Sequence, residues 1–159
     1  MDKYFKFFLD EANKINKVEY SPIDQKGYFE FVKSQYEKGF KQVIITSKMM
    51  LEILSYYFYN NYRVNEIEFC EEDYDLDNEI RNILLKIERD RGEFNTLLKK
   101  LDCIAEDSSI DIAKIKMTSL KQVDNKYFSF TLRVNGIFSV NNENLIEENK
   151  ILKIIKESI

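Results

Sequence analysis

Apolar residues recur along the chain with two periods, one typical of helices and one typical of strands. Helical spacing predicts amphipathic helices over 2–17, 26–38, 48–60, 77–102 and 143–157. Alternation and short β-branched runs predict strands over 43–46, 64–69, 110–117, 127–134 and 137–140. The pattern therefore favours an α+β (or α/β) fold, in which about five helices pack on a small mixed β-sheet of about five short strands.

Local signals connect these predicted elements. Ser21-Pro22-Ile23-Asp24 predicts a turn, Gly39 follows the second helix where a left-handed residue is expected, and Ser47 can cap the third helix. The strand, helix, strand order over 43–69 has the length of a βαβ unit, which predicts two parallel strands joined by a right-handed crossover. Asn135-Gly136 predicts a C-terminal hairpin.

The longest helical pattern and one strand pattern are both interrupted. Arg91 and the adjacent Gly92 interrupt the apolar stripe over 80–101, which leaves open whether the helix over 77–102 is continuous. This stripe can face the core or a partner helix. In the strand over 110–117 the apolar phase slips near Ala113, which predicts a β-bulge.

Composition excludes several classes of protein. A length of 159 residues without repeats, low-complexity stretches or a Pro-rich linker predicts one domain over 1–159. The lack of histidine removes the usual general base and the usual metal ligand, and four widely spaced glycines form neither a dinucleotide fingerprint nor a phosphate loop. Cys70 and Cys103 make no zinc pattern and are expected to be small buried groups. The sequence therefore predicts no cofactor.

The start of the chain and its overall charge bear on location and partners. No signal peptide follows Met1, and no apolar run approaches the ~18 residues that a membrane helix needs. A cytoplasmic protein without membrane contact is therefore expected. The net charge of −4 also argues against direct binding of nucleic acid, which requires a basic face.

The negative charge is concentrated in one window, residues 66–79. This window holds eight acidic residues and no basic one, whereas 1–65 and 80–159 each carry a net charge of +2. The whole negative balance of the chain therefore lies in fourteen residues. Three interpretations of this window compete.

The first interpretation is structural. Glu66 and Glu68 would lie on the solvated face of a strand, because runs of charge are usually solvated. Asp75, Asp77 and Glu79 would lie at the start of a helix, where the helix dipole favours an anion by about 0.3–1 kcal/mol each. This interpretation explains about half of the cluster.

The second interpretation is a metal site. Asp73, Asp75 and Asp77 have the spacing that opens a calcium-binding loop, but Asn78 and Leu84 stand where that loop requires glycine and glutamate, so an EF-hand is excluded. A Mg²⁺ site needs fewer carboxylates and would make the protein a Mg²⁺-dependent phosphoesterase or nuclease. The ligands would be Glu68, Asp73, Asp75 and Asp77.

The third interpretation, which we favour, is a docking surface. Crowded carboxylates repel one another, and a basic partner relieves that repulsion and is attracted by the field. Tyr74 supplies an aromatic anchor of the kind found at interface hot spots. The sequence therefore predicts a non-enzymatic interaction module, such as an inhibitor, immunity or adaptor protein, that docks on a basic protein such as a nucleic-acid-handling one. The partner-binding residues would be Glu71, Glu72, Asp73, Tyr74 and Asp75.

Two further surfaces are candidates for a homodimer. In a helix over 48–60, Tyr57 and Phe58 would point inward, which leaves Tyr56, Tyr59 and Tyr62 outside as an aromatic patch. The apolar stripe over 80–101 is the alternative dimer surface.

Overall fold

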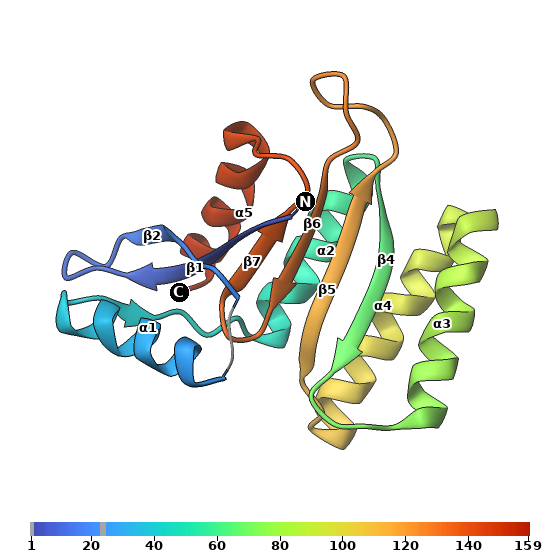
Figure 1. Cartoon of the computed structure of the whole chain (residues 1–159). Coiled ribbons are helices and arrows are strands. Elements are labelled where there is room, and N and C mark those ends of the chain that lie inside the picture. Colours follow the sequence, from blue (N-terminus) through green and yellow to red (C-terminus); the bar gives the residue numbers. More distant parts are fainter. Residues whose placement is uncertain (1, 23–24) are drawn as a thin grey trace.

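A computed structural model gives the structure of residues 2–22 and 25–159 (Figure 1). The strands are β1 (Lys3–Leu9), β2 (Ile15–Glu19), β3 (Lys41–Gln42), β4 (Tyr62–Phe69), β5 (Ile112–Ser119), β6 (Ser129–Arg133) and β7 (Ile137–Val140). The helices are α1 (Gln25–Glu37), α2 (Ser47–Tyr59), α3 (Tyr74–Arg89), α4 (Phe94–Cys103) and α5 (Leu145–Ser158), with a 3₁₀ turn at Arg91–Glu93 and a π turn at Ile104–Ser108. The α+β class is confirmed.

One seven-stranded sheet in the order β2-β1-β7-β6-β5-β4 forms the centre of the fold, with β3 paired to β1. Every strand pairing in the described part of the chain is antiparallel. The expected parallel βαβ pair and the mixed sheet are therefore wrong. The reason lies in 43–46, where the Val43 N–H donates to the Phe7 carbonyl and the Ile45 N–H to the Val134 carbonyl, so this buried segment crosses between strands instead of pairing along one.

The N-terminal segment is a hairpin of β1 and β2, and the helix expected over 2–17 is wrong. Phe5 and Phe7 point into the main core, while Lys6 and Phe8 point to the opposite face and are also buried. A strand covered on both faces is apolar almost throughout, so its residues also satisfy a helical spacing. The predicted turn over 21–24 lies partly outside the described residues.

Helices cover the two faces of the sheet unequally. In Figure 1, α1 lies across one face near β1 and β2, whereas α2, α4 and α5 lie on the other face. The main core forms on that second face, where Met50 and Leu54 of α2 are buried together with Tyr57 and Phe58, which were predicted to point inward. The outer face of β4, β5 and β6 carries polar and charged side chains in place of a helix layer.

Two glycines act as predicted at the ends of elements. Gly39 follows α1 with φ +90°, and Gly136 completes the β6–β7 hairpin turn with φ +81°. A side chain at Gly136 would also meet the Val43 carbonyl oxygen at 2.8 Å, so the hairpin turn packs directly against the 43–46 segment. The predicted bulge at Ala113 is confirmed, because the β4–β5 register shifts there.

The expected long helix over 77–102 is two helices. Asp90 is extended, and its side chain accepts a hydrogen bond from the Gly92 N–H, so α3 ends and a new turn begins. The Arg91 guanidinium leaves the helix stripe to stack 3.9 Å from the Phe58 ring centre and donates to the Phe58 carbonyl. The interruption noted at Arg91 and Gly92 is therefore a break, after which α4 runs back alongside α3 (Figure 1).

The closing helix is confirmed, but its buried face begins with charged residues. Asn144 caps α5, and Glu147 and Glu148 in its first turn are buried together with the apolar residues Ile151 and Ile155. None of the described helices has the length and apolarity that a membrane-spanning helix needs.

Candidate functional site

The acidic window begins on β4, where two glutamates share one lysine. Glu66 and Glu68 are exposed, as the structural interpretation predicts. The Lys114 ammonium of β5 lies 2.9 Å from a Glu66 oxygen and 3.0 Å from a Glu68 oxygen. Burial lowers the pKa of Lys114, but hydrogen bonds and charge attraction from the two glutamates outweigh burial and leave the pKa raised. Both glutamates therefore have a partner within the chain.

The end of the window builds the start of α3. Asp73 is the N-cap, and its Oδ1 accepts a hydrogen bond from the Leu76 N–H at 3.0 Å. Asp75 and Asp77 lie in the first turn, where the helix dipole favours anions. Glu79 lies 2.9 Å from the Lys100 ammonium of α4. The structural interpretation is confirmed for Asp75 and Asp77, whereas Glu79 lies beyond the first turn and pairs with Lys100.

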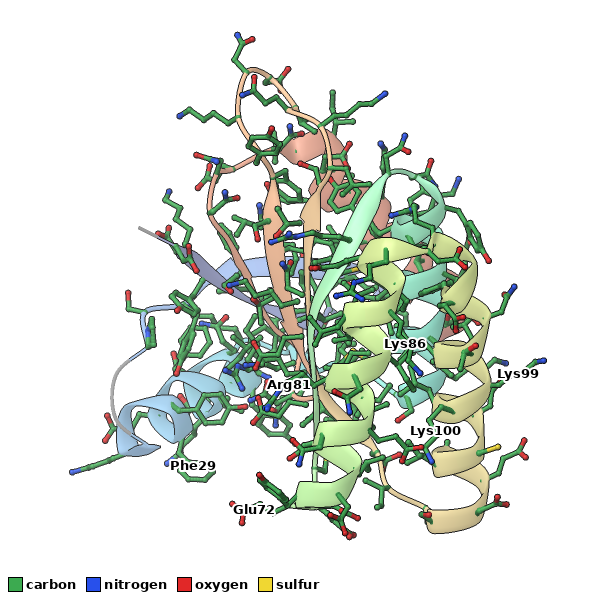
Figure 2. All side chains as sticks on the ribbon, turned by 90° about the vertical axis from the view of Figure 1, so that its right-hand side faces the viewer. Phe29, Glu72, Arg81, Lys86, Lys99 and Lys100 are labelled. Carbon is green, nitrogen blue, oxygen red and sulfur yellow. The ribbon has the colours of Figure 1, made fainter. Side chains whose placement is uncertain are left out.

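The middle of the window extends into solvent. Glu71 and Glu72 form the turn between β4 and α3, and Figure 2 shows Glu72 beside the foot of α3. Tyr74, the first residue of α3, is 80% exposed. All five residues that the sequence predicts as partner-binding, Glu71 to Asp75, are exposed. Of these, Asp73 also has the structural role of capping α3.

A second acidic segment lies beside this turn. The Cys70 N–H donates to the Asp111 carbonyl at 2.9 Å, so the β4–α3 connection and the α4–β5 connection meet at one end of the molecule (Figure 1). The second connection carries exposed Glu106 and Asp107, and Asp111 itself is exposed. We call this surface the acidic end; its carboxylates are those of Glu71, Glu72, Asp73, Asp75, Glu106, Asp107 and Asp111.

The sequence pattern assigns no binding role to the segment 106–111. Its addition to the site depends on α3 and α4 forming a helix pair, which returns the chain to the end of β4. The interruption at Arg91 and Gly92 was the available signal, because a continuous helix would have carried 106–111 away from the window.

The geometry expected of the metal alternative is not found. In residues 2–22 and 25–159, no group of three or more Cys, Asp or Glu side chains is placed to hold a metal ion. Glu68 bonds to Lys114 on the sheet, whereas Asp73 caps α3 and Asp77 lies one helical turn further on. The four predicted ligands therefore do not converge, because they follow a strand, a turn and a helix in succession.

The expected homodimer surfaces also change. Tyr62 is only 4% exposed, and its hydroxyl donates to a Glu147 carboxylate oxygen at 2.8 Å, so the patch of three tyrosines is wrong. Tyr56 and Tyr59 remain exposed. The stripe over 80–101 faces the core of its own chain, with Ile80, Ile87, Phe94 and Leu101 buried.

Sequence reasoning missed a buried polar group next to Tyr62. Glu147 accepts from the Tyr62 hydroxyl and from Lys150, and its backbone carbonyl accepts from the Tyr57 hydroxyl at 2.9 Å. Burial, followed by the proximity of Glu147, raises the pKa of both tyrosines. Nothing in the helical pattern over 143–157 distinguishes the buried Glu147 and Glu148 from solvated glutamates.

The cysteines are exposed, not buried as expected. Partial burial and then the nearby carboxylates of Asp111 and Glu71 raise the pKa of the Cys70 thiol, so Cys70 carries less thiolate than an ordinary cysteine. This environment does not favour a reactive nucleophile.

Comparison with known proteins adds no assignment. No protein-family model matches the chain, and neither a curated protein nor a solved structure matches it.

Proposed function

We propose that this protein is a non-enzymatic interaction module that docks its acidic end on a basic face of another protein, as an inhibitor, immunity or adaptor protein. A nucleic-acid-handling protein has a basic face of the required kind. The observation that carries the proposal is the Cys70–Asp111 hydrogen bond, which holds two acidic connections side by side.

The charges of the acidic end favour association. Like charges within a Debye length of about 8–10 Å repel one another, and a basic partner converts that repulsion into attraction. Such a field steers encounter and raises the association rate more than it raises the final affinity. The acidic end is therefore suited to rapid capture of a basic protein.

Tyr74 supports the same proposal. The residue is 80% exposed and stands in the sequence between Asp73, which caps α3, and Asp75 in its first turn. Exposed tyrosines surrounded by polar groups are frequent anchors at interfaces, because the ring is buried at little conformational cost while the hydroxyl keeps a polar partner.

Charge reversal on both connections tests the proposal. The variant Glu71→Lys, Glu72→Lys, Glu106→Lys changes exposed acids of the two connections and leaves the Asp73 cap intact. Affinity purification from the native host, followed by titration calorimetry with the purified partner, should show capture of a basic protein by the wild type. We expect at least a ~100-fold loss of affinity in the variant, because opposed charges become like charges.

A matched control separates local charge from net charge. The variant Glu30→Lys, Glu37→Lys, Glu157→Lys alters the net charge equally, but its residues lie on α1 and α5 and are exposed. It should retain most of the affinity. Equal binding by wild type and the acidic-end variant, with both variants folded, would show that the acidic end is not the docking surface.

A further inference from the structure

The strand that leads into the acidic end is also the free edge of the sheet. β4 is the last strand in the order, and among the described strands it pairs with β5 alone. It is eight residues long, whereas β2 at the opposite edge has five. An edge strand presents unpaired N–H and C=O groups, which another chain can bind by adding a strand.

A groove runs along this edge. It has a volume of about 360 Å³ and lies between residues 65–68 of β4 and one face of α3. The α3 face consists of Asp77, Ile80, Arg81 and Leu84, which follow helical spacing. Figure 2 looks onto α3 from this side and shows Arg81 on the flank of the helix nearest β4. A strand edge opposite a helix face is the arrangement into which extended peptides insert by strand addition.

Backbone groups of β4 point into this groove. The Cys70 N–H points toward β5, because it donates to the Asp111 carbonyl. Backbone groups alternate in direction along a strand, so the N–H and C=O of Glu68 also point to β5 and those of Ile67 point to the free edge. Ile67 therefore offers one donor and one acceptor to an added strand.

The charges around the groove select a basic occupant. Glu66, Glu68 and Asp77 line it together with Arg81, and with Lys114, which pairs with both glutamates, the balance of these five groups is still negative. Lys114 contacts one oxygen of each β4 glutamate from the β5 side and holds the two carboxylates in place beside the edge. A second copy of this chain is a poor occupant, because antiparallel pairing of β4 about Ile67 would set Glu66 opposite Glu68, and like charges directly opposite are destabilising.

We propose that the β4–α3 groove binds an extended basic segment of the partner protein, which adds to the edge of β4 as an extra strand. This inference rests on the proposed function for the basic character of the partner. Alternate side chains of such a segment face opposite ways. One set would contact the half-buried Leu84, and the other would contact Glu66 and Glu68. The expected segment therefore alternates apolar and basic residues.

A short synthetic peptide tests the groove without the partner. The probe is a fluorescein-labelled heptapeptide that alternates arginine and valine, measured by fluorescence anisotropy. Two analogues each carry N-methyl groups on two central amides that face the same edge of the extended peptide, one analogue for each edge. N-methylation keeps the charge of the peptide but removes those backbone donors. We expect the analogue that blocks the β4-facing edge to bind about tenfold or more weakly, because two backbone hydrogen bonds are lost.

Two tryptophan variants locate the binding. Arg81→Trp fills the groove, whereas Asn82→Trp places the same side chain on the next residue of α3, which is exposed and does not line the groove. We expect Arg81→Trp to weaken binding about tenfold or more and Asn82→Trp to leave it unchanged. Amide hydrogen exchange read by NMR should slow about tenfold at Ile67 when the peptide is bound, because that N–H gains a partner.

The outcomes separate this inference from the proposed function. It is overturned if the peptide shows no saturable binding, if all N-methyl analogues bind equally well, or if an alternating glutamate–valine peptide binds as tightly. In one outcome, partner capture is lost in the variant with Glu71, Glu72 and Glu106 reversed but is unaffected by Arg81→Trp. That result would keep the proposed function and reject the groove. Peptide binding that slows exchange at Ile67, without a partner sensitive to the acidic end, would keep the groove and reject the proposed function.

Discussion

The first turns of α3 and α5 are built from similar residues and end in opposite environments. Each has an Asx N-cap, Asp73 or Asn144, followed by two acids within its first turn. In α3 the acids Asp75 and Asp77 are exposed. Asp75 belongs to the acidic end, and Asp77 borders it. In α5 the corresponding acids, Glu147 and Glu148, are 8% and 1% exposed.

The difference lies in what each helix meets. The first turn of α5 meets donors on β2 and β4, namely the Lys17 ammonium at 2.6 Å from Glu148 and the Tyr62 hydroxyl at 2.8 Å from Glu147. The start of α3 extends past the end of β4, where no strand covers it (Figure 1). Acids of the same local pattern are therefore structural in α5 and available for binding in α3. Substitutions at the two helix starts should therefore differ in their effect on stability.

Removal of Glu148 should have the largest effect. Its carboxylate accepts from the Lys17 ammonium and from the Asn144 N–H, so Glu148→Ala leaves two donors without their acceptor. We expect a loss of about 3 kcal/mol in the free energy of unfolding, at the lower end for buried pairs because Lys17 can regain water. Urea denaturation measures this loss. Glu143→Ala, which breaks the exposed pair with Lys3, is the control and should leave the urea midpoint nearly unchanged.

The contrast also shows how far sequence reasoning could go. The place of Asp75 and Asp77 near a helix start was predictable, because helix dipoles act locally, although α3 begins at Tyr74 and not at the predicted residue 77. The burial of Glu147 and Glu148 was not, because their partners Tyr62 and Lys17 lie far away in sequence and are brought close only by the sheet order. The prediction of a helix over 2–17 was wrong for a related reason. β1 is covered on both faces, and only knowledge that α1 covers its outer face distinguishes such a strand from a helix.

Lys6 is a buried charge without a carboxylate partner among the described residues, and its replacement should stabilise the fold, unlike the removal of Glu148. Lys6 is fully buried beside the rings of Phe8 and Tyr28, and its ammonium donates to the Asn135 carbonyl. Burial lowers the pKa of Lys6 to about 8. We expect Lys6→Met to raise the free energy of unfolding at pH 7 by about 1–2 kcal/mol, because an apolar side chain avoids the desolvation of the ammonium. Lys17→Met should instead be destabilising, because it leaves Glu148 buried without its cation.

The pH dependence of stability identifies Lys6 independently. Between pH 8 and the unfolded pKa of 10.5, the unfolded chain binds more protons at Lys6 than the folded chain, so stability rises with pH there, by on the order of 2–3 kcal/mol in total. Above about pH 10 the buried hydroxyls of Tyr57 and Tyr62 oppose this rise, because burial raises their pKa values in the folded state alone. Urea midpoints measured from pH 7 to 10 should rise in the wild type and stay flatter in Lys6→Met; parallel curves would contradict the assignment.

Removal of the Tyr62 hydroxyl tests the role of Glu147, the second buried glutamate of α5. Tyr62→Phe keeps the ring contacts with Tyr57 and Phe130 but removes the donor to Glu147. We expect a loss of about 1–2 kcal/mol, because a hydrogen bond to a charged group is lost while Lys150 still contacts the carboxylate. A double-mutant cycle with Glu147→Gln should give a coupling energy above about 0.5 kcal/mol, and additivity would show that the two groups do not interact.

The α3 side of the comparison should respond more weakly. Asp73→Ala removes the cap on the Leu76 N–H and should lower the free energy of unfolding by about 1 kcal/mol. Asp73→Asn and Asp73→Ser keep a capping acceptor and should recover most of the loss, which separates capping from charge. Failure of both to recover stability would mean that the carboxylate charge, and not the hydrogen bond, supports the start of α3.

The exposed acids of the turn should contribute least to stability. Glu71→Gln with Glu72→Gln removes two charges from a crowded surface, and we expect the free energy of unfolding to change by less than about 0.5 kcal/mol, in the stabilising direction because repulsion falls. The same variant should slow association with a basic partner, and the rate should depend less steeply on salt than in the wild type, because the steering field is weaker. Stopped-flow association at several salt concentrations measures both effects. A variant that is destabilised yet associates at the wild-type rate would place Glu71 and Glu72 with the structural acids of α5, and would remove the distinction between the two helix starts on which the acidic end depends.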